Sequence, residues 1–282
     1  MKSFFRLAFV NSCISVLLLN AGVSCFAKDL FPDKSLEAAV RSQVYAKRKS
    51  SAPLTEDDVK NVSEVRAVGK GIKSLEGLQY CKSLQLLDLR ENKVSSLLPL
   101  KDLTRLQSVR LADNKIESLD PIAGLDRVQL LDLSGNAVKD LSSLAKMTNL
   151  RTLYLSGNPI SEIDVLEALP KMTSLHLDDT KVASIEMLAK LSWLSTLTIA
   201  KTQVSRVDAL KSLRQLRNLD LSETPVSDLS PLVAMAEGDE EGRFASFWKI
   251  HLAGTPAVER LTEASKKAID RLQSLGVRLI LD

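Results

Sequence analysis

Apolar and polar positions recur with a fixed period along most of the chain. Residues 84–237 divide into seven 22-residue units, in which positions 1, 4, 6, 11, 14, 17 and 20 are always apolar. All 49 of these positions are Leu, Ile, Val or Met, against about 22 expected from the 45% apolar content of the chain. The pattern predicts a solenoid of stacked coils. The units begin at Leu84, Leu106, Val128, Leu150, Met172, Leu194 and Leu216.

Each unit contains the signals of one strand and one helical turn. Positions 3 to 7 alternate in polarity, as in TLYLS at residues 152–156, which predicts a short strand with an outward polar face. At position 9 we expect a polar side chain to bond the turn backbone, because a buried turn cannot leave its polar groups unpaired. That position is Asn92, Asn114, Asn136, Asn158, Thr180, Thr202 and Thr224 in order. Position 15 is interpreted as a helix N-cap at Asp120, Ser142, Asp164, Asp208 and Ser230, and Pro follows at Pro99, Pro121 and Pro231.

The motif LxxLxLxxNxI followed by LxxLxxL resembles the 22-residue class of leucine-rich repeats in bacterial internalin-like proteins. The resemblance covers residues 62–257. It implies an α/β leucine-rich repeat solenoid, with a curved parallel β-sheet on the concave side, short helical turns on the convex side and helical caps. It also implies a curved binding surface and leaves the partner open.

The first 27 residues have the pattern of a signal peptide. Lys2 and Arg6 precede an apolar run over residues 7–19, and Ala27 suits cleavage. The run is too short for a membrane span, which needs about 20 residues. We therefore expect a secreted or periplasmic bacterial protein with no membrane span after cleavage. Lipid anchoring through Cys25 is the alternative.

The remaining chain is expected to consist of a repeat array and two caps. Residues 28–61 are predicted to form an N-terminal helical cap, with Asp33 capping one helix and Thr55 with Asp58 forming a capping box on a second. The solenoid is predicted over residues 62–257, with an acidic loop insertion at 237–246. Residues 258–282 are predicted to form a cap helix, whose apolar face includes Leu261 and Leu272, and a final strand that pairs or packs over the open end.

Charge and composition argue against nucleic acid as a partner. Loss of the first 27 residues lowers the net charge from +3 to +1, because it removes Lys2 and Arg6 and no acidic residue. With 4% aromatic residues and no basic run interleaved with aromatic residues, nucleic acid is not an expected partner. Cys81 would be the single remaining cysteine, and its place in the repeat predicts a core residue.

No catalytic residues, metal site or cofactor are predicted. His176 and His251 fall on the outward strand face three strands apart, on the order of 14 Å, which is too far for one metal ion. His176 and Asp178 share a face, but no motif fixes a serine or cysteine nucleophile beside them. We therefore expect a non-enzymatic binding protein.

Position 5 of the strands suggests where a protein partner binds. Arg66, Asp88, Arg110 and Asp132 alternate in sign and are expected to pair across neighbouring strands. Beyond them the alternation stops, so Tyr154, His176 and Asp178 are the candidate partner-binding residues, with uncommitted polar and aromatic groups. The alternative is a cell-envelope structural or glycan-binding component, which would need Tyr154, Trp193 and Trp248 as sugar platforms. Packing is the expected role of both tryptophans.

Overall fold

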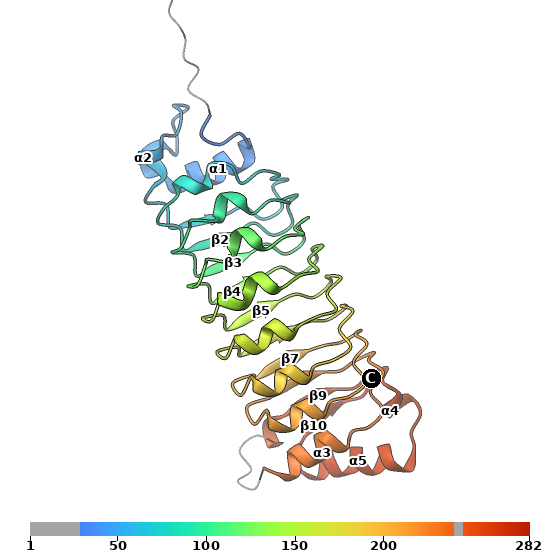
Figure 1. Cartoon of the computed structure of the whole chain (residues 1–282). Helices are drawn as coiled ribbons and strands as arrows, with labels where there is room; N and C mark the ends of the chain where they lie inside the picture. Colours follow the sequence, from blue (N-terminus) through green and yellow to red (C-terminus); the bar gives the residue numbers. More distant parts are fainter. Residues whose placement is uncertain (1–28, 240–244) are drawn as a thin grey trace, which may run out of the picture.

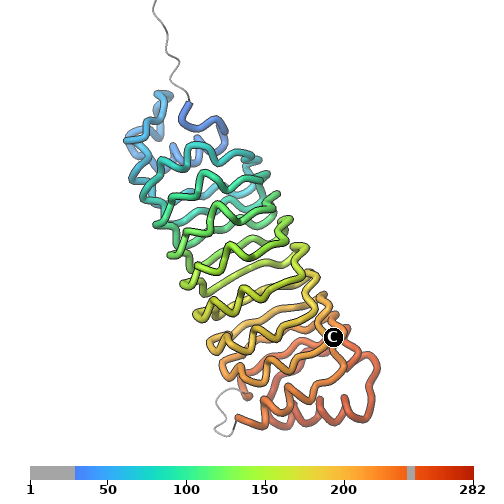
Figure 2. The backbone as a smooth tube through the Cα atoms, in the orientation of Figure 1, coloured from blue at the N-terminus to red at the C-terminus, as the bar shows by residue number. Residues whose placement is uncertain are grey.

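The computed structural model describes residues 29–239 and 245–282. The chain forms an elongated stack of coils, with the strands in one row and short helical turns on the opposite side (Figure 1). The backbone trace in Figure 2 shows successive coils lying side by side along the molecule. The expected signal peptide and residues 240–244 of the expected acidic loop lie outside the described residues.

One parallel sheet runs the length of the stack, with its strands in sequence order. Neighbouring strands pair residues 22 apart, as Leu153 with Leu175, until Asn218 pairs with Lys249 across the nine-residue insertion. The predicted solenoid with a parallel sheet is confirmed, and the final strand pairs with its neighbour as expected. The strands are β1 (Glu64–Arg66), β2 (Leu86–Asp88), β3 (Ser108–Arg110), β4 (Leu130–Asp132), β5 (Thr152–Tyr154), β6 (Ser174–His176), β7 (Thr196–Thr198), β8 (Asn218–Asp220), β9 (Lys249–His251) and β10 (Arg278–Ile280).

Short helices close each coil behind the sheet. Their bounds are η2 (Leu78–Tyr80), η3 (Leu98–Leu100), η4 (Asp120–Ile122), η5 (Ser142–Lys146), η6 (Asp164–Ala168), η7 (Glu186–Lys190), η8 (Asp208–Ser212) and α3 (Ser230–Glu237). The position-15 side chains do not cap these helices as predicted, because each is already the first helical residue. In several coils the side chain at position 13 instead accepts a hydrogen bond from the backbone N–H at the start of the helix. The carboxylate of Asp140, for example, accepts from Ser142 N at 2.8 Å.

The apolar repeat positions fill the space between sheet and helices and form one continuous core. In the fourth unit, Leu150, Leu153, Leu155 and Ile160 are all fully buried. Cys81 is also buried, as predicted, and this burial raises the pKa of its thiol to about 12. No helix in the described part of the chain is long and apolar enough to cross a membrane.

The N-terminal end of the stack is covered by α1 (Lys34–Gln43), η1 (Tyr45–Lys47) and α2 (Glu56–Val59). Asp33 caps α1, and Thr55 with Asp58 forms the predicted capping box of α2. Burial would raise the pKa of Asp33, but bonds from four backbone N–H groups outweigh this and lower it. Two of those donors, Lys73 and Ser74, belong to the first coil, so Asp33 also ties the cap to the solenoid.

The C-terminal end departs from the predicted single cap helix. The chain forms α4 (Pro256–Glu259) and α5 (Glu263–Ser274), because Thr262 adopts extended backbone and caps α5. Leu261 lies in the break and is 63% exposed, so its predicted place on the packed helix face is wrong. The expected loop at 237–246 also begins and ends in helix, since α3 includes Glu237 and η9 (Ala245–Phe247) begins at Ala245.

Candidate partner-binding site

Tyr154 and His176 form a stacked pair on the outward face of the sheet, called the strand face below. They end β5 and β6 and are partners in the sheet register. Their ring centroids are 4.4 Å apart, and the ring planes differ by 14°. The stack follows from the repeat, because Leu153 and Leu175 point into the core and neighbouring parallel strands are about 4.8 Å apart. Two of the three partner-binding residues predicted from the sequence are therefore in direct contact.

Thr198 and Asp178 hold His176 in one orientation. Thr198 Oγ1 lies 3.0 Å from His176 Nδ1 and donates to Asp178 Oδ2 at 2.5 Å. A hydroxyl has one proton, so Thr198 can only accept from the imidazole, and Nδ1 must carry a proton. The neutral ring therefore presents Nε2 as an acceptor. Burial lowers the pKa of His176 and outweighs the opposing charges of Asp178 and Asp132, which favours this neutral form.

Asp178 differs from the prediction that all three candidate residues have uncommitted groups. Its Oδ2 also accepts from Ser156 Oγ at 3.0 Å, and its Oδ1 accepts from Ala200 N at 2.9 Å. The carboxylate therefore binds neighbouring coils together and positions Thr198. By contrast, the Tyr154 hydroxyl and His176 Nε2 have no hydrogen bond to a described residue. The capacity for binding is concentrated in the stacked rings.

The predicted cross-strand ion pairs do not form at position 5, although the charge of Arg110 acts on Asp88 of the neighbouring strand and helps to lower its pKa. Arg66 pairs with Glu64 of its own strand, and Arg90 donates to both oxygens of Asp88 at 2.8 and 2.9 Å. Residues two apart share a strand face, and a long Arg side chain spans that separation. Burial would raise the pKa of Asp88, but the Arg90 bonds outweigh it and keep the carboxylate charged. Arg110 and Asp132 are register partners, but no ion pair joins them.

The two tryptophans have different surroundings. Trp248 is fully buried, which confirms its predicted packing role and prevents it from acting as a sugar platform. Trp193 is 65% exposed, so the packing role predicted for it is wrong. Nearby in the repeat, Phe247 is equally exposed, and the Arg217 guanidinium lies 6.0 Å from its ring centroid. These side chains precede β7 to β9, beside the strand face rather than on it.

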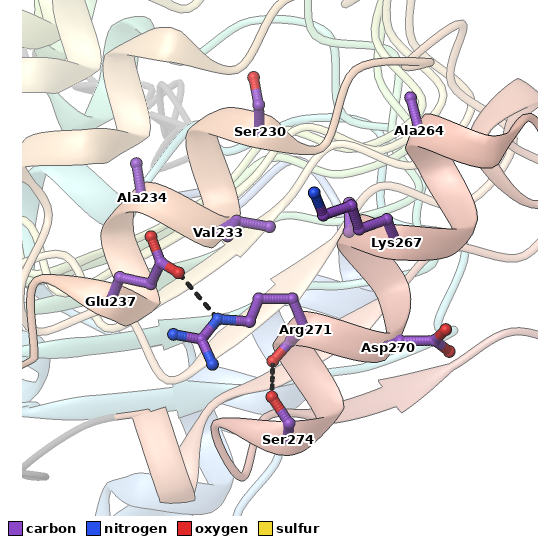
Figure 3. A pocket seen from close by; sticks show the side chains of 10 residues that line it. Ser230, Val233, Ala234, Glu237, Ala264, Lys267, Asp270, Arg271 and Ser274 are labelled. Carbon is purple, nitrogen blue, oxygen red and sulfur yellow. Dashed lines mark hydrogen bonds and ion pairs between the residues drawn. The ribbon is translucent and has the colours of Figure 1, made fainter.

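The C-terminal cap contains a groove away from the strand face. This groove of about 690 Å³ separates α3 from α5, with Val233, Ala234 and Ala264 among its lining residues (Figure 3). Two of its charged groups pair, as Arg271 Nε donates to Glu237 at 2.8 Å, and Lys267 and Asp270 also line it. The sequence did not predict this groove. The helix α5 follows the repeats, so the repeat pattern does not indicate how α5 packs on α3.

Metal and nucleophile chemistry find no support on the strand face. In residues 29–239 and 245–282, no group of three or more His, Cys, Asp or Glu side chains is placed to hold a metal ion. The Thr198 hydroxyl is bonded to the imidazole ring, but it accepts from His176 and donates to Asp178. An activated nucleophile needs the opposite direction, with its own proton donated to a base.

Comparisons with known proteins agree with the repeat. The family model for leucine rich repeat matches residues 104–160, and that for leucine rich repeats in two copies matches residues 148–190. No curated protein matches the chain. An internalin C2 structure from Listeria monocytogenes is 32% identical, with a TM-score of 0.70 over 73% of this chain and 91% of that chain.

Two further structures share the fold at 18% identity. A leucine-rich repeat protein from Leptospira interrogans has a TM-score of 0.58 over 74% of this chain and 57% of its own. The functional domain of InlJ from Listeria monocytogenes, which includes a cysteine ladder, has a TM-score of 0.53 over 80% of this chain and 56% of its own. The 32% identity to internalin C2 over 73% of the chain shows that the chain belongs to the internalin-like leucine-rich repeat proteins.

Proposed function

We propose that this chain is an exported, non-enzymatic binding protein that engages a protein partner through its strand face. The observation that carries the proposal is the Tyr154–His176 stack, whose hydroxyl and Nε2 have no bond to a described residue. Tyrosine is a favoured interface anchor, because it buries a large rigid ring and keeps a polar tip. In this proposal Asp178 positions His176 through Thr198 rather than contacting the partner.

Export is part of the proposal and rests on the sequence of residues 1–27. Similarity to internalin C2 supports a role in binding but does not identify a partner. Two observations disfavour the glycan-binding alternative. Trp248 is buried and cannot stack on a sugar, and His176 covers one face of the Tyr154 ring. A protein contact along the parallel strands makes better use of the face.

Capture from envelope and culture fractions of the source cell tests this function. The double variant Tyr154→Ala with His176→Ala should weaken capture of a bound protein at least tenfold, on the order of 1.4 kcal/mol. Arg66→Ala with Arg110→Ala is the matched control on the same face and should leave capture unchanged. Lys267→Glu serves as a second control at the cap groove. All variants should keep the parent melting temperature.

The opposite pattern would reject the strand-face site. If the arginine control abolishes capture while the Tyr154 and His176 variant retains it, the binding half of the face is misassigned. If Lys267→Glu alone abolishes it, the partner uses the cap groove. Retention on purified peptidoglycan that depends on Tyr154 would favour the glycan alternative.

A further inference from the structure

Charge is unevenly distributed along the strand face. Positions 3, 5 and 7 of the coils containing β4 to β8 carry Asp132, Asp178 and Asp220 and no Lys or Arg. The same positions in the preceding coils carry Arg66, Arg90 and Arg110 together with Glu64 and Asp88, so their formal charge is +1 (three basic, two acidic) against −3 for the three Asp of the later coils. The charges that act on His176 are likewise carboxylates, those of Asp178 and Asp132. The stacked rings therefore lie in the acidic part of the face.

The Tyr154 ring has one face left for a ligand. His176 covers the side toward β6, so the other side is turned toward β4, where Asp132 is the register partner of Tyr154. Asp132 Oδ1 accepts from Ser134 N at 3.2 Å, and its other oxygen has no bond to a described residue. A side chain entering there would meet an aromatic face and a carboxylate.

The polar atoms beside the open face of the Tyr154 ring are acceptors, so they favour a ligand that donates hydrogen bonds. His176 Nε2 is an acceptor in the neutral ring, because Nδ1 donates to Thr198. A carboxylate oxygen accepts, and an aromatic face attracts cations. Lys and Arg side chains carry several N–H donors, no acceptor and a positive charge, so they match all three groups.

From this complementarity we propose that the strand face over β4 to β8 binds a basic segment of the partner protein, with a Lys or Arg side chain over the open face of Tyr154. This inference rests on the proposed function and specifies the chemistry of its partner. Asp132 and Asp220 flank the stacked rings on either side and attract the segment. Asp178 acts indirectly, by fixing the acceptor side of His176.

A random twelve-residue peptide library displayed on phage, selected against the purified full chain, provides the test. The recovered peptides should be enriched in Lys and Arg relative to the input library. Synthetic copies should bind at least tenfold more weakly to Tyr154→Ala and to Asp132→Asn with Asp220→Asn. Tyr154→Phe should retain binding, because it keeps the aromatic face. Arg66→Gln with Arg110→Gln is the matched control and should not weaken binding.

Each other outcome has a defined meaning. Recovered peptides that need Tyr154 and His176 but are acidic or apolar overturn the basic-segment inference and leave the proposed function standing. Basic peptides that bind the Tyr154→Ala and Asp132→Asn, Asp220→Asn variants as well as the parent do not bind the strand face over β4 to β8, and also overturn it. If all recovered peptides bind independently of every strand-face residue, the proposed function fails as well.

Discussion

Asn136 shows how a single side chain joins two coils. Its Nδ2 donates to Leu133 O of its own coil and to Leu111 O of the preceding one, both at 2.9 Å. Its Oδ1 accepts from Ile116 N, also in the preceding coil, at 2.9 Å. The sequence predicted this role, because a polar residue at a buried turn must pair with the backbone.

Replacing Asn136 by Ala should lower the free energy of unfolding by about 1–3 kcal/mol, since buried backbone groups would lose their partners. Ser134→Ala is the matched control on the solvent side of the same coil and should change stability far less. Urea unfolding measures both. Equal midpoints with similar slopes would show that the Asn column does not hold the coils together.

The contact of Tyr154 with His176 follows from the repeat register and could be anticipated. The commitment of Asp178 could not, because it depends on the rotamers of Thr198 and Ser156. The left-handed backbone at position 8 was also missed. Its signal was present in Gly135 and Gly157, but the same conformation is adopted by Glu91, Asp113, Asp179, Lys201 and Glu223, with φ of 54 to 58°.

At the scale of elements, strands were predicted more accurately than helix ends. A strand needs only period-2 alternation, which most units display. Helix starts depend on which side chain reaches the free N–H groups, and position 13 does so where position 15 was expected. The apolar spacing of the last helix likewise concealed its break at Thr262, whose capping box with Ser265 starts a new helix.

The C-terminal cap offers a direct test of which leucine seals the stack. Leu272→Asp should destabilise the last coils first, because it places a charge in the buried face of α5. Leu261→Asp is the control, since that side chain is 63% exposed, and it should have little effect. Hydrogen exchange should show lost protection around β9 and β10 for Leu272→Asp. Leu272→Ala should give a weaker form of the same pattern.

Two outcomes would contradict this assignment of the cap. One is equal loss of protection in the Leu261 variant. The other is loss confined to the N-terminal coils, because the unfolding of a one-dimensional stack should begin beside the damaged end.

For the whole molecule, both ends of the stack need close contact with a cap. Gly77 marks the N-terminal contact, with a φ of 104°. A Cβ at this position would lie 2.3 Å from Phe31 Cδ1 and 2.5 Å from Leu30 O. The sequence predicted that a cap precedes the repeats, since an open coil would expose its core. It did not predict that glycine permits the cap to approach the first coils.

Cohesion between coils is not uniform along the stack. Asn92, Asn114, Asn136 and Asn158 each bond the preceding coil as well as their own. From the next coil on, the hydroxyls of Thr180, Thr202, Thr224 and Thr255 donate within their own coil. The sheet and core are continuous across this change. The ladder of position-9 side chains between coils therefore ends at Asn158.

This change predicts a gradient of local stability. Amides in β2 to β5 should exchange with solvent more slowly than those in β6 to β8, because the position-9 side chain bonds the preceding coil only in the first group. Thr180→Asn should extend the ladder by one coil, giving Ile160 N the acceptor that Asn158 gives Val138 N at 3.0 Å. We expect a gain of about 0.5–1.5 kcal/mol per added bond and slower exchange around β6.

Thr180→Val is the matched control, since it keeps the branched shape and removes the hydroxyl that donates to Leu177 O. It should destabilise the same coil. Uniform exchange along the sheet, together with no gain from Thr180→Asn, would mean that cohesion depends on the sheet and core alone. Slower exchange confined to the coils that adjoin the substituted position would instead show that the ladder acts between neighbours, as the one-dimensional contacts of the stack require.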